Sequence, residues 1–245
     1  MCRSGGPTAL DIVALKIVRD AVLPNYCLLH LYAILFAYNL AMSSTLKVQA
    51  SAAYFPNMNR RTSFTNQLLV AMPSLADSKF SRSVTLVCEH SPDAGALGIV
   101  INKPLTMTLD VVFEQMKLQT LDAALGLGLV LCGGPVHRER GFVIHRSGGD
   151  WDSSHKISEG IQVTTSRDVL AAMAQGIGPA NAFVALGYAG WEAGQLEREM
   201  KDNAWLSLPV DQQILFDTPF EDRWHAIWRQ LGIDVARISH IAGHA

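Results

Sequence analysis

Two glycine-containing turns hold the residue types that could bind a small anionic ligand. Residues 133–136, GGPV, end one apolar segment, and residues 187–191, GYAGW, join another apolar segment to a charged one. Glycine allows a close backbone approach, and the N–H groups at the start of a helix can hold a phosphate or a carboxylate. The candidate ligand-binding residues in the two turns are Gly133, Gly134, Pro135, Gly187, Gly190 and Trp191.

The same turns also have a structural interpretation, in which glycine serves tight packing and Trp191 is the buried anchor of a corner. Glu192 would repel an anion that approached the second turn, and the chain contains no GxxxxGK[ST] phosphate loop. The sequence therefore favours packing corners over a backbone-lined pocket. A pocket bounded by both turns stays open as the alternative.

His90 and Lys103 complete the set of candidate ligand-binding residues. Lys103 ends a predicted strand, and burial there would change its pKa. His90 follows Cys88 by two residues, so the two side chains leave a strand on the same face. Together with Cys132 and His137 they offer atom types that bind zinc, but their spacing matches no zinc signature. We therefore predict no metal site, and nothing in the sequence indicates a cofactor.

No group of residues indicates a catalytic mechanism. The segment HRSGGD at residues 145–150 contains Ser, His and Asp, but catalytic triads are assembled from distant parts of a chain, and GxSxG is absent. Paired carboxylates occur only in helical surface patterns. The catalytic residues are therefore unknown, and the sequence leans towards a protein that is not an enzyme.

The composition narrows the choice of partner and of compartment. The chain has 20 Lys and Arg residues against 22 Asp and Glu residues, for a formal net charge of −2. The overall charge of the protein therefore does not attract nucleic acid. The charged segment 192–202 is too acidic for a helix that reads a DNA groove. The 4 cysteines are scattered without a CxxC pair, as is typical of a reducing compartment. We expect a cytoplasmic protein that binds a protein partner or a small ligand and does not bind nucleic acid directly.

The elements that must position these residues run from residue 64 onward. Strands are predicted at residues 66–72, 83–90, 96–105, 127–132, 141–147, 160–166 and 181–191, and helices at 108–117, 167–175, 192–202, 219–231 and 234–241. We expect strands 83–90 and 96–105 to form a hairpin, and strand 141–147 to pair with strand 127–132. Hairpins outnumber strand–helix–strand units, which predicts an α+β fold with a mostly antiparallel or mixed sheet. No linker divides residues 64–245, which indicates a single domain.

Residues 1–63 differ from the rest of the chain. Residues 28–42 are mostly apolar but shorter than the roughly 20 clean residues of a bilayer span, and residues 50–52 offer small side chains for signal-peptide cleavage. Three interpretations stay open for this extension: a mis-set start or disposable segment, a targeting segment that exports the protein or holds it at a membrane, and folded structure. Membrane association could come only from residues 10–42.

Six segments between residues 64 and 245 resemble the YqgE/AlgH family of bacterial proteins. In chain order they are NQLLVAMPSLADSKFSRSVTLVCEH, GALGIVINKPL, CGGPVHRERGFVIHRS, VTTSRDVL, LGYAGWEAGQLEREMKDNAWL and LGIDVARISHIAGHA. The resemblance implies a single α+β domain whose curved sheet forms an open pseudo-barrel flanked by helices, in a cytoplasmic protein. It implies no catalytic residue. Relatives begin near residues 61–65, which favours a misplaced start for this chain.

Some members of that family carry the label of transcriptional regulator of exopolysaccharide (alginate) production. We therefore expect a non-enzymatic protein that acts through protein partners or a small ligand, with a role in such regulation. An enzyme or a ligand sensor, with its pocket at the turns 133–136 and 187–191, is the alternative function.

Overall fold

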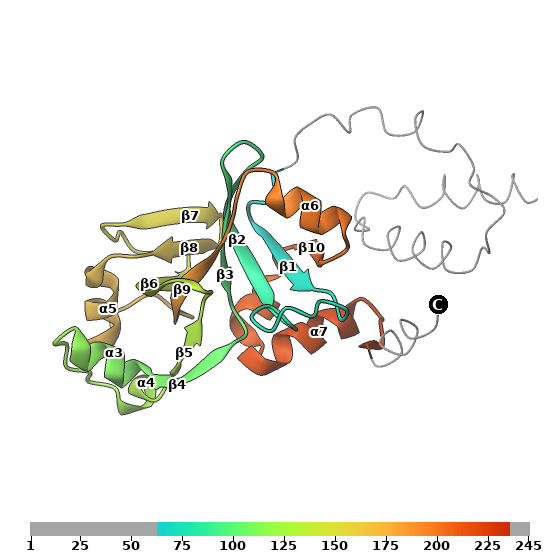
Figure 1. The fold of residues 1–245 in the computed structure, drawn as a ribbon. Coiled ribbons are helices and arrows are strands. Elements are labelled where there is room, and N and C mark those ends of the chain that lie inside the picture. The colour runs from blue at the N-terminus through green and yellow to red at the C-terminus, as the bar shows by residue number, and fades with distance from the viewer. Residues whose placement is uncertain (1–62, 236–245) are drawn as a thin grey trace, which may run out of the picture. The chain divides into compact units, whose positions relative to one another are not determined.

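The computed structural model describes residues 63–235, which Figure 1 draws in colour. The predicted extension before residue 63, with its apolar segment 28–42, lies outside the described residues, as does most of the predicted helix 234–241. None of the helices in the described part of the chain combines the length and the apolar character needed to cross a bilayer.

One sheet of 10 strands organises the described residues. The strands are β1 (Gln67–Ala71), β2 (Val84–Ser91), β3 (Gly95–Val100), β4 (Pro104–Thr108), β5 (Leu129–Cys132), β6 (Val136–Arg146), β7 (Ser154–Ser158), β8 (Ile161–Thr164), β9 (Phe183–Trp191) and β10 (Trp205–Pro209). The α-helices are α3 (Leu109–Gln115), α4 (Ala123–Gly126), α5 (Arg167–Ala174), α6 (Gln195–Lys201) and α7 (Arg223–Gln230). A π-helix, η1 (Gln213–Asp217), and a 3-10 helix, η2 (Phe220–Asp222), precede α7.

The sheet order is β10-β1-β2-β3-β9-β6-β8-β7, and β5 joins β9 while carrying β4 on its other side. Among the described strands every pair is antiparallel except β5 with β9. The sheet curls into an open half-barrel, with α3, α4 and α5 near one end and α7 beside β1 to β3 (Figure 1). The predicted single α+β domain with a curved, mostly antiparallel sheet is confirmed.

Strand β9 is the central strand of the sheet. Its residues Ala185 and Leu186 pair with β5 on one edge and with β6 on the other, and its last residues pair with β3. The chain therefore passes from one edge of β9 to the other between Cys132 and Val136, a span of only three residues. That crossing brings two backbones into contact, and it determines where glycine is needed.

The predicted strand 96–105 is wrong at its centre, because the chain forms two strands there. β3 ends at Val100, and β4 begins at Pro104 and pairs with β5. Between them the buried side chain of Asn102 takes the place of ladder bonds: its Oδ1 accepts from the Val84 N–H at 2.7 Å, and its Nδ2 donates to the Arg82 carbonyl at 2.8 Å. A side-chain amide that satisfies two backbone groups ends the strand locally.

The predicted pairing of strand 141–147 with strand 127–132 is also wrong. Strand β6 lies between β8 and β9, whereas β5 lies between β4 and β9. Both edges of β5 are occupied by β4 and β9, and residues 137–140, expected as a hairpin turn, lie within β6 itself. Strands β7 and β10 and helix α4 were not predicted from the sequence.

Helix α7 forms because its apolar residues repeat at helical spacing. Trp224, Ile227 and Trp228 are buried on one face of the helix, which packs against the largest apolar cluster of the sheet. After the helix the chain turns at Gly232, whose φ is 71°, and the N–H groups of Gly232 and Ile233 bond to the carbonyls of Arg229 and Trp228 at 3.0 Å. This glycine termination directs the following residues back along the helix.

Arg223, the first residue of α7, is a buried cation that joins three parts of the fold. It is 1% exposed, its Nη1 donates to the Ile101 carbonyl, and its Nε donates to the Thr218 carbonyl at 3.1 Å. Its guanidinium lies over the rings of Phe183, at 4.9 Å, and Phe220, at 4.6 Å. Burial lowers the pKa of Arg223 to about 10, so the group is still charged at neutral pH.

Acid should destabilise the fold partly through His145, which is fully buried on β6. Its Nδ1 donates to the Arg146 carbonyl at 2.8 Å, which leaves Nε2 to accept from the Thr164 hydroxyl at 2.8 Å. Burial lowers the pKa of His145 and outweighs the hydrogen bond to the Arg146 carbonyl, which raises it. The unfolded chain therefore binds the proton more readily than the folded one. The stabilising effect of neutral His145 is present above its unfolded pKa, about 6.5, and is lost as the pH falls below it.

We therefore expect the free energy of unfolding to fall between pH 7 and pH 5, with a slope from this residue of at most about 1.4 kcal/mol per pH unit. Urea unfolding of the parent protein and of His145→Gln at several pH values measures the effect. The variant, which cannot titrate at this position, should show the shallower dependence. Parallel curves for the two proteins would contradict the assignment.

Candidate functional site

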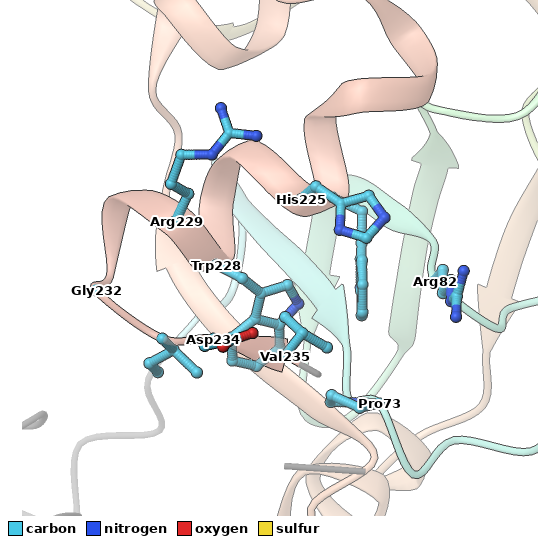
Figure 2. A pocket seen from close by; sticks show the side chains of 10 residues that line it. Pro73, Arg82, His225, Trp228, Arg229, Gly232, Asp234 and Val235 are labelled. Atoms are coloured by element: carbon cyan, nitrogen blue, oxygen red, sulfur yellow. The ribbon is translucent and has the colours of Figure 1, made fainter. Parts of the chain in front are cut away.

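A hollow of about 640 Å³ lies beside α7 and is the candidate site (Figure 2). It is lined by residues of three segments: Pro73 after β1, Arg82 in the turn before β2, and α7 with the residues that follow it. The described lining is Pro73, Arg82, Trp224, His225, Trp228, Arg229, Gly232, Ile233, Asp234 and Val235. A smaller hollow of about 290 Å³ shares Arg82, Trp224 and His225 and adds Asn102, Lys103, Pro104 and Glu221.

The backbone of Arg82 is fixed beside the hollow by two side chains from the connection between β3 and β4. Its backbone has a φ of 54°, which non-glycine residues seldom adopt, and its carbonyl accepts from Asn102 Nδ2 at 2.8 Å. Lys103 Nζ donates to the Ser81 carbonyl at 2.7 Å, one residue earlier. The side chains of Asn102 and Lys103 thus clamp the turn 81–83. The exposed guanidinium of Arg82 then lies 5.7 Å from the ring centroid of Trp224.

The two tryptophans of α7 differ in how their indole N–H groups are satisfied. Trp224 Nε1 donates to the Ala71 carbonyl at 2.8 Å and so anchors the helix to β1. Trp228, only 2% exposed, has no hydrogen-bond partner for its Nε1 among the described residues. An indole N–H can only donate a hydrogen bond, so the group that Trp228 lacks is an acceptor. In Figure 2 this nitrogen lies on the edge of the ring towards Val235 and His225.

The charged groups of the main hollow are mostly basic. Arg82 and Arg229 are cationic, and the ring of His225 meets that of Trp224 edge-on at 4.9 Å. Asp234 is the one acidic side chain in the described lining, and it makes an interaction of its own. Basic groups above an apolar floor of tryptophan, proline and aliphatic side chains can hold a small molecule that is partly apolar and partly anionic.

The two glycine turns meet at the crossing over β9. A Cβ atom on Gly133 would lie 2.3 Å from the Gly187 carbonyl oxygen, and one on Gly134 would lie 2.1 Å from the carbonyl carbon of Tyr188. On Gly187, whose φ is 75°, a Cβ would lie 2.6 Å from the Gly134 oxygen. Backbone fills the space between these turns, as the packing interpretation of the sequence predicts. A ligand-binding role for Gly133, Gly134, Pro135, Gly187 and Gly190 stays a prediction.

Trp191 is the buried anchor that the sequence predicts. It is 6% exposed, and its Nε1 donates to Glu199 Oε2 at 2.9 Å, the same oxygen that accepts from Trp205 Nε1 at 2.8 Å. One carboxylate oxygen of α6 thus ties the last strand β10 to the end of β9. Both indole nitrogens are satisfied within the fold.

His90 and Lys103 lie apart from each other and serve different hydrogen bonds. His90 is buried near the end of β2, where Nδ1 accepts from the Phe64 N–H at 3.1 Å and Nε2 donates to Glu197 at 3.1 Å. Lys103 lines the smaller hollow, and burial, aided by the positive charge of Arg82, lowers its pKa below the ordinary value. Lys103 is the only residue predicted as ligand-binding that belongs to the described lining of either hollow.

Other reactive groups of the described region serve the fold. Burial, with a smaller effect from the charge of Glu89, raises the pKa of the Cys88 thiol to about 12, so it is not a thiolate at neutral pH. Within residues 63–235 no cluster of His, Cys, Asp and Glu has the arrangement of a metal site.

The described lining of the main hollow contains none of the residues predicted as ligand-binding. Arg82, His225 and Trp228 carry it, and no short motif links them. The spacing of Trp224 and Trp228 in WHAIW was a usable signal, because residues four apart share a helix face. That signal indicates a buried face and does not distinguish a core from the floor of a site.

Comparison with known proteins places the chain among bacterial relatives. A family model described as AlgH-like matches residues 68–236. A UPF0301 protein of Xanthomonas axonopodis pv. citri is 52% identical over 184 residues, which cover 75% of this chain and 97% of the relative. A UPF0301 protein of Thioalkalivibrio sulfidiphilus is 53% identical over 188 residues, which cover 77% of this chain and 100% of the relative.

Solved structures agree with this fold. The solution structure of the AlgH protein from Pseudomonas aeruginosa is 45% identical in sequence, covers 76% of this chain and 97% of its own, and superposes with a TM-score of 0.62. A crystal structure of a protein from Corynebacterium diphtheriae, 18% identical, covers 69% of this chain and 87% of its own, with a TM-score of 0.55. The second likeness concerns the fold alone.

Proposed function

Because the chain belongs to the AlgH-like family, we propose that it is a cytoplasmic binding protein that acts without catalysis, by holding a small ligand in the hollow beside α7. The observation that carries the proposal is the hollow itself. Its volume of about 640 Å³ is typical of small-molecule sites, which span roughly 300–1,000 Å³. Its described lining offers basic groups and an apolar floor, and it contains no hydroxyl or thiol that could act as a nucleophile.

A bound ligand would connect α7 to the turn 81–83, two segments far apart in the chain. The ligand would then change which conformations of this surface are populated, and a protein partner that docks there would respond. We propose that regulation of exopolysaccharide (alginate) genes, if this chain shares that family role, runs through such a partner. Direct contact with DNA is disfavoured by the net charge of −2. The free thiols of Cys88 and Cys132 are compatible with the reducing compartment that we propose.

A thermal-shift screen of metabolites against the full chain tests the proposal. A ligand at a hundredfold excess over its Kd stabilises the folded state by about 2.7 kcal/mol, which raises Tm by about 5–10 °C for a domain of this size. The variant Val235→Trp, which places a large ring in the hollow, should lose the shift. Leu121→Trp is the matched control on an exposed residue elsewhere and should keep it.

Two results would overturn the proposal. A ligand that stabilises Val235→Trp as well as the parent protein binds outside the hollow. A ligand that mass spectrometry recovers in converted form, in amounts exceeding the protein, shows catalytic turnover. Binding without catalysis is supported if the ligand is recovered unchanged and the Tm shift appears in the parent protein and Leu121→Trp but not in Val235→Trp.

A further inference from the structure

We propose that the ligand of the hollow is an organic acid, with an apolar body that lies on Pro73, Ile233 and Val235 and an anionic group that faces Arg82 and accepts from Trp228. This inference rests on the proposed function and adds the chemical class of the ligand. It draws on three features of the described lining, namely an unsatisfied donor, a positioned cation and an apolar floor.

The unsatisfied donor is Trp228 Nε1. The indole of Trp224, four residues earlier on the same helix face, is bonded to Ala71, so the lack of a partner at Trp228 is not a general property of the face. A buried polar group without a partner is destabilising, and an acceptor carried by a ligand would remove that cost. The nitrogen has less than 1 Å² of accessible surface. A ligand that accepts from this nitrogen therefore has to uncover it on binding.

The positioned cation is Arg82. A non-glycine residue with a φ of 54° is held in a conformation that needs support, and Asn102 and Lys103 supply it through hydrogen bonds to carbonyls of the turn 81–83. These bonds fix the backbone of the turn, and the exposed guanidinium of Arg82 lies over Trp224 at the edge of both hollows. A guanidinium presents a planar set of donors that can bind a carboxylate or a phosphate through two parallel hydrogen bonds.

The charge balance around the hollow favours an anion over a cation. Arg82 and Arg229 carry positive charge in the lining of the main hollow, and Lys103 lines the smaller one with its ammonium bonded to Ser81. Against them stand Asp234, which has an interaction of its own, and Glu221 in the smaller hollow. Carboxylate and phosphate share the chemistry that these groups recognise, and the experiment distinguishes them.

The apolar floor determines the rest of the ligand. Trp224 and Trp228 meet with ring centroids 5.9 Å apart, and Pro73, Ile233 and Val235 complete the apolar lining. Both tryptophans are 2% exposed, so the apolar surface open to a ligand is that of the half-buried Pro73, Ile233 and Val235, which a free inorganic anion would leave in contact with water. An alkyl or aromatic body would cover this surface, and the affinity should rise with each CH₂ group that is buried there.

Calorimetric titration of the full chain with four eight-carbon probes tests the ligand class. The probes are octanoate, octyl phosphate, octan-1-ol and octylamine, which differ only in the head group. We expect octanoate or octyl phosphate to bind at least tenfold more tightly than octan-1-ol, and octylamine to bind more weakly than either acid. Whichever acid binds more tightly identifies the anionic group.

Three variants locate the contacts. Arg82→Gln should weaken the preferred acid about tenfold and leave octan-1-ol unchanged, because only the charged contact is lost. Trp228→Phe keeps an aromatic ring without the N–H and should weaken the acid several-fold. Arg167→Gln, an exposed arginine outside the hollow, is the control and should change nothing. Circular dichroism and Tm of each variant establish that it is folded.

The outcomes separate this inference from the proposed function. The organic-acid assignment is overturned if octan-1-ol or octylamine binds as tightly as both acids. It is also overturned if Arg82→Gln and the parent protein bind the acids with equal affinity. Binding in the hollow would still stand if Val235→Trp abolished it. If none of the four probes binds and the metabolite screen finds no stabilising compound, both the organic-acid assignment and the proposed function are overturned.

Discussion

Replacing Gly187 by alanine should lower the free energy of unfolding by about 3 kcal/mol, whereas the same change at Gly176 should cost only about 1 kcal/mol. The two glycines have nearly the same positive φ, 75° and 74°. Both substitutions therefore carry the strain of placing a side chain in the left-handed region, about 1–2 kcal/mol. The difference between them comes from what surrounds each Cα.

At Gly187 the new Cβ would lie 2.6 Å from the Gly134 oxygen and 2.9 Å from the Val136 oxygen, both backbone atoms. At Gly176 it would meet nothing within 4 Å. Backbone atoms at the crossing over β9 cannot turn aside as a side chain can, so the overpacking cost of about 1–3 kcal/mol falls on Gly187 alone.

Urea unfolding of both variants and the parent protein, at equal m-values, measures the difference. Equal losses at the two positions would mean that the crossing yields easily and that the backbones are not in firm contact. In that event the glycine turns would again be candidates for a ligand pocket.

Arg223→Ala should lower the free energy of unfolding by about 3–5 kcal/mol. The change leaves the Ile101 and Thr218 carbonyls without their donor, removes a cation from the faces of Phe183 and Phe220, and opens a cavity at the start of α7. Each of these effects is destabilising. Because they act on groups in contact, the total need not equal the sum of the parts.

Two further variants separate the contributions. Arg223→Met keeps most of the side-chain volume and loses the hydrogen bonds, so it should cost less than alanine, about 1–3 kcal/mol. Arg167→Ala removes a side-chain donor to the Met116 carbonyl, 2.8 Å away, at an exposed position, and should cost less than about 1 kcal/mol. A loss at Arg223→Ala no greater than at Arg167→Ala would show that the buried arginine does not hold α7 to the sheet.

The strands that the sequence predicted well are those with their own apolar pattern. β1, β2 and β9 are rich in buried aliphatic residues, and their bounds differ from the predicted ones by a few residues. β7, SHKIS, lacks such a pattern and forms because β8 offers it a backbone partner. β10 ends in Pro209 and is completed by β1. Pairing partners are a property of the folded sheet, which local pattern does not encode.

The same distinction holds for the site. The glycine turns were found because glycine marks special backbone geometry in any sequence, and the structure places that geometry at the crossing over β9. The hollow joins Arg82 to His225 and Trp228, which come from the two ends of the described chain. Their proximity follows from α7 packing beside β1 and β2, and no spacing in the sequence expresses it.

The partnership of β1 with β10 has a consequence for the newly made protein. β1 is among the first described residues to leave the ribosome, yet one of its two neighbours, β10, is synthesised after every other strand of the sheet. Until then the N–H and C=O groups on that edge of β1 are open to pairing with another chain. A translation product that stops before Trp205 keeps this edge open, which exposes it to strand pairing with another chain.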